Sequence, residues 1–174
     1  PDVPRLAISP YRTGCLGGLA ALGWRPDRAG AQMTKAMLLA EGLYFGEGPR
    51  WRNDRLWFSD FYERAVKSLD SSGNVRTELE IDDQPSGLGW LPDGRLLVVA
   101  MHRRQLLRVD PGGVKVHADL SHVATHHTND MVVDAVGRAY VGNFGFPLDA
   151  ELKARGVESV IADHPTANLA RVDP

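Results

Sequence analysis

The stretch that decides the fold is PSGLGWLPDGRLLVV, residues 85–99. It places a short apolar run, the turn Pro92-Asp93-Gly94 and a second apolar run directly one after another. Asp-Gly between two hydrophobic runs predicts a β-hairpin, because glycine adopts positive φ without steric cost. The second run, residues 96–100, is apolar throughout, which is typical of a strand that is covered on both faces. We therefore expect two paired strands of a buried antiparallel sheet.

Two further runs extend this hairpin into a larger sheet. Residues 105–110 and 114–118 are separated by the turn Pro111-Gly112-Gly113. Tight turns between consecutive strands join antiparallel neighbours. The four runs together predict one four-stranded antiparallel meander.

The same pattern occurs on both sides of this unit, at an offset of about 40 residues. Upstream, residues 48–51 correspond to residues 87–90, and we expect strands over 37–45, 55–60, 65–70 and 75–81. Downstream, residues 129–134 and 138–142 begin a third copy, and residues 168–174 repeat the ending at 107–111. A period of about 40 residues is that of β-propeller blades, so the predicted fold class is all-β, with about three blades.

Three blades cannot close a ring, because propellers typically have 4–8. We therefore expect residues 33–174 to be the N-terminal half of a β-propeller whose ring is incomplete in this chain. Residues 144–167 interrupt the third blade and contain a helix-like run over 148–156 that ends at a glycine.

Residues 1–32 differ from the rest of the chain. They are rich in proline, glycine, arginine and alanine and show no strand alternation. Met33-Thr34-Lys35 resembles a natural start. We expect residues 1–32 to be a poorly structured leader or upstream extension, with a short surface helix as the alternative.

The composition narrows the classes of function. The 174 residues carry a net charge of −2, which gives no reason to expect nucleic acid or an anionic membrane as a partner. No apolar run approaches the roughly 20 residues of a membrane span. The one cysteine, Cys15, allows no internal disulfide, so secretion is not implied and we expect a cytoplasmic protein.

Three polar residues occupy equivalent positions in the three copies: Glu47, Ser86 and Asn129. Each lies near the innermost strand of its blade, where side chains of successive blades converge on the axis. Carboxylate and amide oxygens suit a hard cation such as calcium, which takes about 6–8 oxygen ligands. The alternatives are a solvated turn glutamate at 47 and an Asx turn at 129.

Several motifs, in the same order and spacing, resemble the senescence marker protein/gluconolactonase/luciferin-regenerating enzyme (SGL) family. The resemblance covers roughly residues 37–174. It implies a six-bladed β-propeller that holds a divalent cation, usually calcium, and hydrolyses lactones or related esters, so that the partner is a small molecule. The motifs that carry it are Gly46-Glu47-Gly48-Pro49-Arg50-Trp51, Gln84-Pro85-Ser86-Gly87, Leu91-Pro92-Asp93-Gly94-Arg95-Leu96, Asn129-Asp130-Met131-Val132-Val133-Asp134 and Gly142-Asn143-Phe144-Gly145.

The resemblance also assigns roles to individual residues. It implies Glu47 as a metal ligand and Asn129 as a ligand or a substrate contact. His127 stands where family members often hold a substrate-reading arginine or other polar residue, which puts sugar-acid specificity in doubt; solvent exposure is the alternative. The residues themselves make Asn143 a further candidate substrate contact or a turn residue, and we expect Asp130 to brace the site. The remaining ligands and the catalytic base are expected beyond residue 174.

Other polar residues are better explained by structure than by chemistry. Asp54, Asp70, Asp93 and Asp110 recur as turn residues, and Asp60 and His102 read as loop residues. The spacing of His122 and His126 would suit zinc on a helix, but the segment reads as a loop without a nearby cysteine. No Gly-x-Ser-x-Gly elbow is present.

These observations predict metal-dependent hydrolysis of a lactone or related ester. A non-catalytic binding propeller remains the alternative from a different class, because a fold does not define a function. A fragment without activity of its own is the third possibility.

Overall fold

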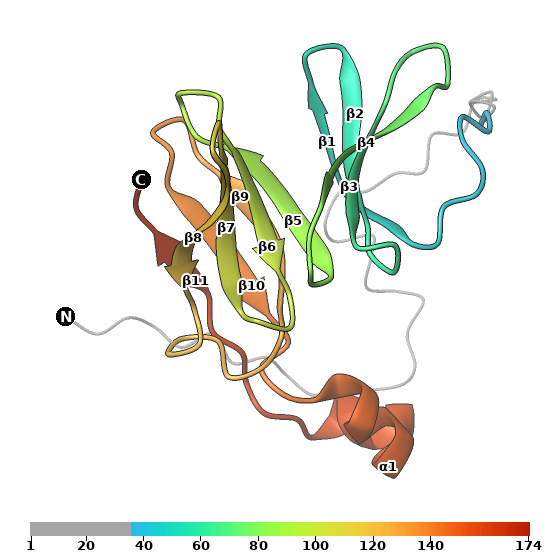
Figure 1. The fold of residues 1–174 in the computed structure, drawn as a ribbon. Coiled ribbons are helices and arrows are strands. Elements are labelled where there is room, and N and C mark those ends of the chain that lie inside the picture. Colours follow the sequence, from blue (N-terminus) through green and yellow to red (C-terminus); the bar gives the residue numbers. More distant parts are fainter. Residues whose placement is uncertain (1–35) are drawn as a thin grey trace, which may run out of the picture. The chain divides into compact units, whose positions relative to one another are not determined.

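The computed structural model describes residues 36–174 and contains three antiparallel sheets and one helix (Figure 1). The predicted leader, residues 1–32, lies outside the described residues. Within the described part, the sheets confirm the predicted all-β class and the blade pattern of a β-propeller.

The first two blades are four-stranded meanders in which each strand pairs with the next along the chain. Blade 1 consists of β1 (Gly46–Arg52), β2 (Arg55–Asp60), β3 (Ala65–Leu69) and β4 (Val75–Glu80). Blade 2 consists of β5 (Pro85–Trp90), β6 (Leu96–Ala100), β7 (Gln105–Asp110) and β8 (Gly113–Asp119). All five residues of β6 are buried, as its uninterrupted apolar run predicts.

Blade 3 is three-stranded and contains the helix within its last connection. It consists of β9 (Thr128–Val133), β10 (Ala139–Asn143) and β11 (Ala170–Val172), and α1 (Leu148–Ala162) lies between β10 and β11. The helix-like run was predicted to end at Gly156. Gly156 instead forms a kink with φ of 77°, and helical structure resumes after it and buries Val160.

The strand predicted over residues 37–45 is wrong. No strand forms there, and the first strand begins at Gly46. Met37 and Leu38 are 77% and 74% exposed, so this apolar run is not buried in a sheet. The backbone amides of Tyr44 and Phe45 donate to the carboxylate of Asp60. That side chain therefore replaces the strand partner that the segment would need.

Asp70 and Asp93 confirm their predicted turn roles, and Asp134 has the same role. Asp110 instead ends β7, where its carboxylate pairs with Arg95 and Arg108. The Asp70, Asp93 and Asp134 carboxylates each accept a hydrogen bond from the backbone amide two residues further on, at 2.9–3.1 Å. Such Asx turns satisfy the backbone where one strand of a blade reverses into the next.

Two apolar clusters connect neighbouring blades. Leu88, Leu96 and Val98 of blade 2 pack with Val66 of blade 1. A larger cluster joins blade 2 to blade 3 and includes Leu97, Val99, Leu106, Met131, Ala139 and Val141. The strands β5 and β9 come so close that a Cβ on Gly87 would lie 2.4 Å from the Met131 amide nitrogen.

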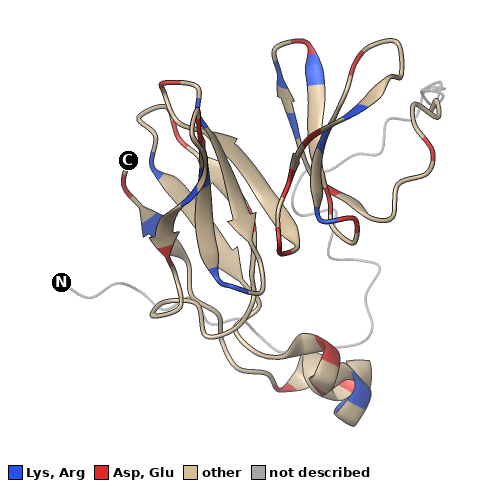
Figure 2. Cartoon of the chain, in the orientation of Figure 1, with Lys and Arg blue, Asp and Glu red and all other residues tan. Residues whose placement is uncertain are grey.

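Charged residues of both signs are interspersed over the strands and turns (Figure 2). Among residues 36–174, no helix has the length and apolar character to cross a membrane.

Candidate functional site

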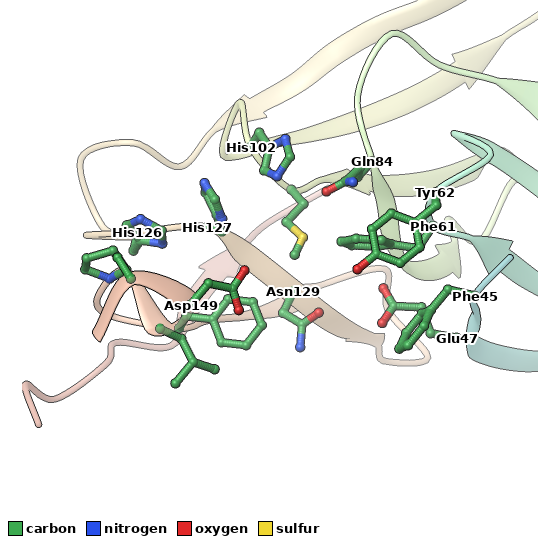
Figure 3. Close-up of a pocket in the computed structure, with 15 residues that line it drawn as sticks. Phe45, Glu47, Phe61, Tyr62, Gln84, His102, His126, His127, Asn129 and Asp149 are labelled. Atoms are coloured by element: carbon green, nitrogen blue, oxygen red, sulfur yellow. The ribbon is translucent and has the colours of Figure 1, made fainter. Parts of the chain in front are cut away.

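A cavity of about 610 Å³ lies among the starts of the inner strands, the loops that follow β2 and β6, and the beginning of α1. Its lining is mainly aromatic and apolar. Glu47 and Asn129, the two predicted metal ligands, both line it, as does His127. The structure therefore brings together three of the residues that the sequence singles out (Figure 3).

Ser86 connects the equivalent positions of the three blades. Its hydroxyl donates to Asn129 Oδ1 at 2.8 Å, and its carbonyl accepts from the Ser59 hydroxyl at 2.7 Å. Ser59 and Ser86 are 0% and 2% exposed. The Asn129 amide is thus held by a buried chain of hydrogen bonds that begins in blade 1.

Glu47 has a buried side-chain oxygen, Oε1, that lacks a hydrogen-bond partner among the described residues. Burial raises the pKa of the Glu47 carboxyl, the nearby Ser86 hydroxyl partly opposes that change, and the negative charge of Asp130 adds to it. A buried carboxylate oxygen without a partner is costly unless a cation or a donor meets it.

The chemistry of these donors fits a hard divalent cation. Glu47 offers a carboxylate oxygen and Asn129 an amide oxygen, the ligand types that calcium takes. Within residues 36–174, no cluster of three or more His, Cys, Asp or Glu is arranged to hold a metal ion. Glu47 and Asn129 are therefore the described residues that would hold such an ion.

Asp130 lies beside the cavity lining and belongs to an ion pair. Its Oδ1 accepts from Arg50 Nη2 at 2.9 Å and from its neighbour's amide, Met131 N, at 2.8 Å. Its side chain is 67% exposed. The contact joins β1 of blade 1 to β9 of blade 3 next to Glu47 and Asn129.

The structure does not bring Asn143 to the cavity. This residue ends β10, opposite Thr128, and its Nδ2 donates to the Asn168 carbonyl at 2.6 Å. Its Oδ1 is buried and lacks a hydrogen-bond partner among the described residues. Its observed contact connects the third blade to the segment that follows α1.

Three histidines gather on one side of the cavity. The ring centroids of His126 and His127 are 4.0 Å apart, and those of His127 and His102 are 4.4 Å apart. Burial, and next the nearby His126 and His102, lower the pKa of His127. His102 reads as a loop residue from the sequence, and the cavity that its loop borders became visible only in the structure.

Asp60, which occupies the corresponding place in blade 1, has a different role. Its carboxylate is fully buried and bonds Lys67 Nζ at 2.8 Å. Equivalent positions in the repeat thus hold a buried ion pair in one blade and a cavity residue in the next.

Three aromatic residues on the cavity were not identified from the sequence: Phe45, Phe61 and Tyr62. Asp149, at the start of α1, also lines the cavity, which places the predicted helical insertion at the site. The signal that could have identified them is that aromatic residues stand directly before β1 and directly after β2, and the two ends of a hairpin lie at the same end of a sheet.

The fold and the site define a protein of the β-propeller class. Within that class, the chain belongs to the SMP-30/gluconolactonase/LRE-like family, whose SGL region matches residues 45–174.

Two solved structures illustrate the similarity. A gluconolactonase from Xanthomonas campestris matches at 22% identity with a TM-score of 0.57, over 78% of this chain and 46% of its own. A structure described as a candidate gluconolactonase matches at 20% identity with a TM-score of 0.55, over 78% of this chain and 48% of its own. At these identities the likeness concerns the fold, and the chain spans about half the length of these relatives.

Proposed function

We propose that this protein takes part in the metal-dependent hydrolysis of a lactone or a related ester. Membership of the gluconolactonase-containing family and the likeness to solved gluconolactonases support this class of reaction. The observation that carries the proposal is the buried, unpartnered Glu47 Oε1 in a cavity shared with Asn129. A bound cation would satisfy that oxygen, and the family of the chain supports hydrolysis as the use of the cation.

We further propose that residues 33–174 supply the N-terminal half of a six-bladed propeller. The relatives are about twice as long as the matched region, which supports this division. The remaining ligands and the general base would then come from the other half. The cation is proposed to be calcium, because both candidate ligand atoms are oxygens.

Each residue has a defined task in this proposal. Glu47 and Asn129 hold the cation or, for Asn129, orient the substrate. Ser86 fixes the Asn129 amide by its 2.8 Å hydrogen bond. Asp130 and Arg50 hold β9 against β1, so that the two oxygen donors keep their spacing. A bound divalent cation would supply a Lewis acid that polarises the substrate carbonyl.

The test uses the full-length gene product and the variant Glu47→Gln. We expect calcium binding, measured by titration calorimetry, and calcium-dependent hydrolysis of glucono-δ-lactone. Glu47→Gln should lose at least about 100-fold in kcat/KM, because it removes an ionic ligand. The exposed Glu158→Gln is the matched control and should leave both measurements unchanged. Full activity and unchanged calcium affinity in Glu47→Gln would overturn the proposal, and a protein without hydrolysis or cation binding would favour a binding propeller.

A further inference from the structure

The cavity has two aromatic walls. Figure 3 shows Phe45, Phe61 and Tyr62 together on one side, His102, His126 and His127 on the other, and Asn129 between the two groups. The first three residues follow or precede strands of blade 1. The histidines come from the loop after β6 and from the loop before β9.

In the first wall, Phe45, Phe61 and Tyr62 pack on one another at steep angles and leave ring surface uncovered. Phe61 and Tyr62 have centroids 4.9 Å apart at 89°, and Phe45 lies 5.8 Å from each of them. Phe45 and Tyr62 are nevertheless 51% and 62% exposed. Aromatic rings with this much free surface offer faces and edges to a further ring.

The backbone of this wall is held by buried charge. The Phe45 amide donates to Asp60 Oδ1 at 2.9 Å, and the Phe61 amide donates to the Phe45 carbonyl at 2.9 Å. Asp60 is itself paired with the buried Lys67. This wall is therefore already ordered in the free protein, so that a ligand ring would bind without the entropic cost of ordering it.

The imidazole wall is held in a corresponding way by Asp83, which is 6% exposed. Asp83 Oδ1 lies 3.4 Å from His102 Nδ1, and its carboxylate accepts from the backbone amides of His102 and Arg103 at 3.3 and 2.9 Å. These contacts orient the His102 ring, against which His127 packs at 4.4 Å.

The polar content of the cavity points to the kind of molecule it would accept. None of the described residues that line it is a lysine or arginine, and Glu47 and Asp149 carry its two carboxylates. A negatively charged group would therefore depend on the proposed cation for a positive partner, because no lysine or arginine of the described lining supplies one. The uncovered ring surfaces of Phe45 and Tyr62 would gain most from an aromatic partner, because a ring packs on them without leaving a polar group unpaired.

We propose that the two walls form a subsite for a planar aromatic group of the substrate, so that the preferred substrates are aryl-fused lactones or aryl esters. This inference rests on the proposed function and specifies its substrate class. The aromatic group would lie between Tyr62 and His102, with the carbonyl directed toward Asn129 and Glu47.

The first experiment compares two six-membered lactones on the full-length protein: dihydrocoumarin, which carries a fused benzene ring, and glucono-δ-lactone. We expect a higher kcat/KM for dihydrocoumarin. Tyr62→Ala and His102→Ala should each reduce the ratio of the two kcat/KM values by about three- to tenfold, the effect of one lost aromatic contact. Tyr44→Ala and His122→Ala are the matched controls, since neither residue lines the cavity, and they should leave the ratio unchanged.

A second measurement separates this inference from the proposed reaction. Dihydroquinolinone, the lactam counterpart of dihydrocoumarin, should bind without being hydrolysed, and Tyr62→Ala should weaken its binding by a similar factor in titration calorimetry. Hydrolysis of glucono-δ-lactone with no lactam binding would overturn the aromatic subsite and leave the lactonase proposal standing. Lactam binding that depends on Tyr62, without hydrolysis of either lactone, would support the subsite and overturn the reaction.

Discussion

At the scale of single residues, one position of the blade repeat has three different uses. Glu47, Ser86 and Asn129 lie near the starts of β1, β5 and β9, the first strands of successive blades. The Ser86 hydroxyl donates to Asn129 Oδ1 at 2.8 Å. Glu47 remains without a partner among the described residues at its buried oxygen. The residue with the plain hydroxyl therefore supports the site, and the two residues with larger polar groups offer oxygens to it.

The buried Asp60 carboxylate predicts how the free energy of unfolding depends on pH. Burial by itself raises the pKa of this carboxyl, but hydrogen bonds from Lys67, Phe45 and Tyr44 outweigh burial and hold the pKa below its ordinary value. A lowered pKa contributes stability above the unfolded value of about 3.9, and this contribution disappears as the pH falls through the folded value. We therefore expect the free energy of unfolding to decrease as the pH is lowered from about 4.

The variant Asp60→Asn isolates this contribution. Its free energy of unfolding at pH 7 should be about 3 kcal/mol lower, because it breaks a buried ion pair. Its stability should also change less steeply than that of the unmodified protein between about pH 4 and 2. Urea unfolding at several pH values measures both effects, with the exposed Asp54→Asn as the control. Parallel pH curves for Asp60→Asn and the unmodified protein would contradict this account.

At the scale of elements, the approach of β5 to β9 depends on missing side chains. A Cβ on Gly87 would lie 2.4 Å from Met131 N, and a Cβ on Gly89 would lie 2.4 Å from Val133 Cγ2. Glycine permits this contact, which places Ser86 and Asn129 within hydrogen-bond distance. The pattern Gly-Leu-Gly in the sequence thus determines how closely blades 2 and 3 pack.

We expect Gly87→Ala to lower the free energy of unfolding by about 1–3 kcal/mol, the usual effect of overpacking. It should also weaken the calcium binding that we propose, since Asn129 would move with β9. Gly112→Ala is the matched control, because a Cβ there meets nothing within 4 Å and its φ is not positive. Equal urea midpoints for the two variants would show that β5 and β9 do not pack as described.

At the scale of the whole described region, stability depends on apolar clusters that cross from blade to blade. Leu88 and Val66 are both fully buried and belong to different blades. The larger cluster does the same between blades 2 and 3. Blades that share their cores in this way are expected to unfold together.

Leu88→Ala tests that cooperativity. This variant should lower the free energy of unfolding by about 2–5 kcal/mol, the range for truncating a buried leucine. Because the cluster is shared, far-ultraviolet circular dichroism and tryptophan fluorescence should still report one coincident urea transition at a lower midpoint. The 69% exposed Leu169→Ala should leave the midpoint nearly unchanged. Separate transitions in the two signals would show that the blades are independent.

Much of the fold could be predicted because the blade is a local structure. The turn at Asp93-Gly94 and the uninterrupted apolar run of β6 specify a hairpin from neighbouring residues alone. A strand over residues 37–45 was predicted from the same kind of local apolar run, and that prediction is wrong. Its apolar residues are exposed, and a side chain distant in sequence, Asp60, takes the backbone hydrogen bonds of Tyr44 and Phe45.

The candidate site shows the same division. Comparison of the copies singles out Glu47 and Asn129, because these larger polar residues stand at the position where blade 2 has Ser86. Asn143 and His102 could not be placed in this way. One ends a strand away from the cavity, and the other lines the cavity through a loop whose position depends on Asp83.

The sequence by itself determined the blade repeat, the turns and the two positions at which Glu47 and Asn129 stand in place of Ser86. Each of these depends on local periodicity or on the comparison of copies. Only the tertiary structure decided that two aromatic walls face the candidate oxygen ligands. Those walls consist of residues from separate loops, and buried carboxylates of Asp60 and Asp83 hold them in place through contacts that no local pattern records.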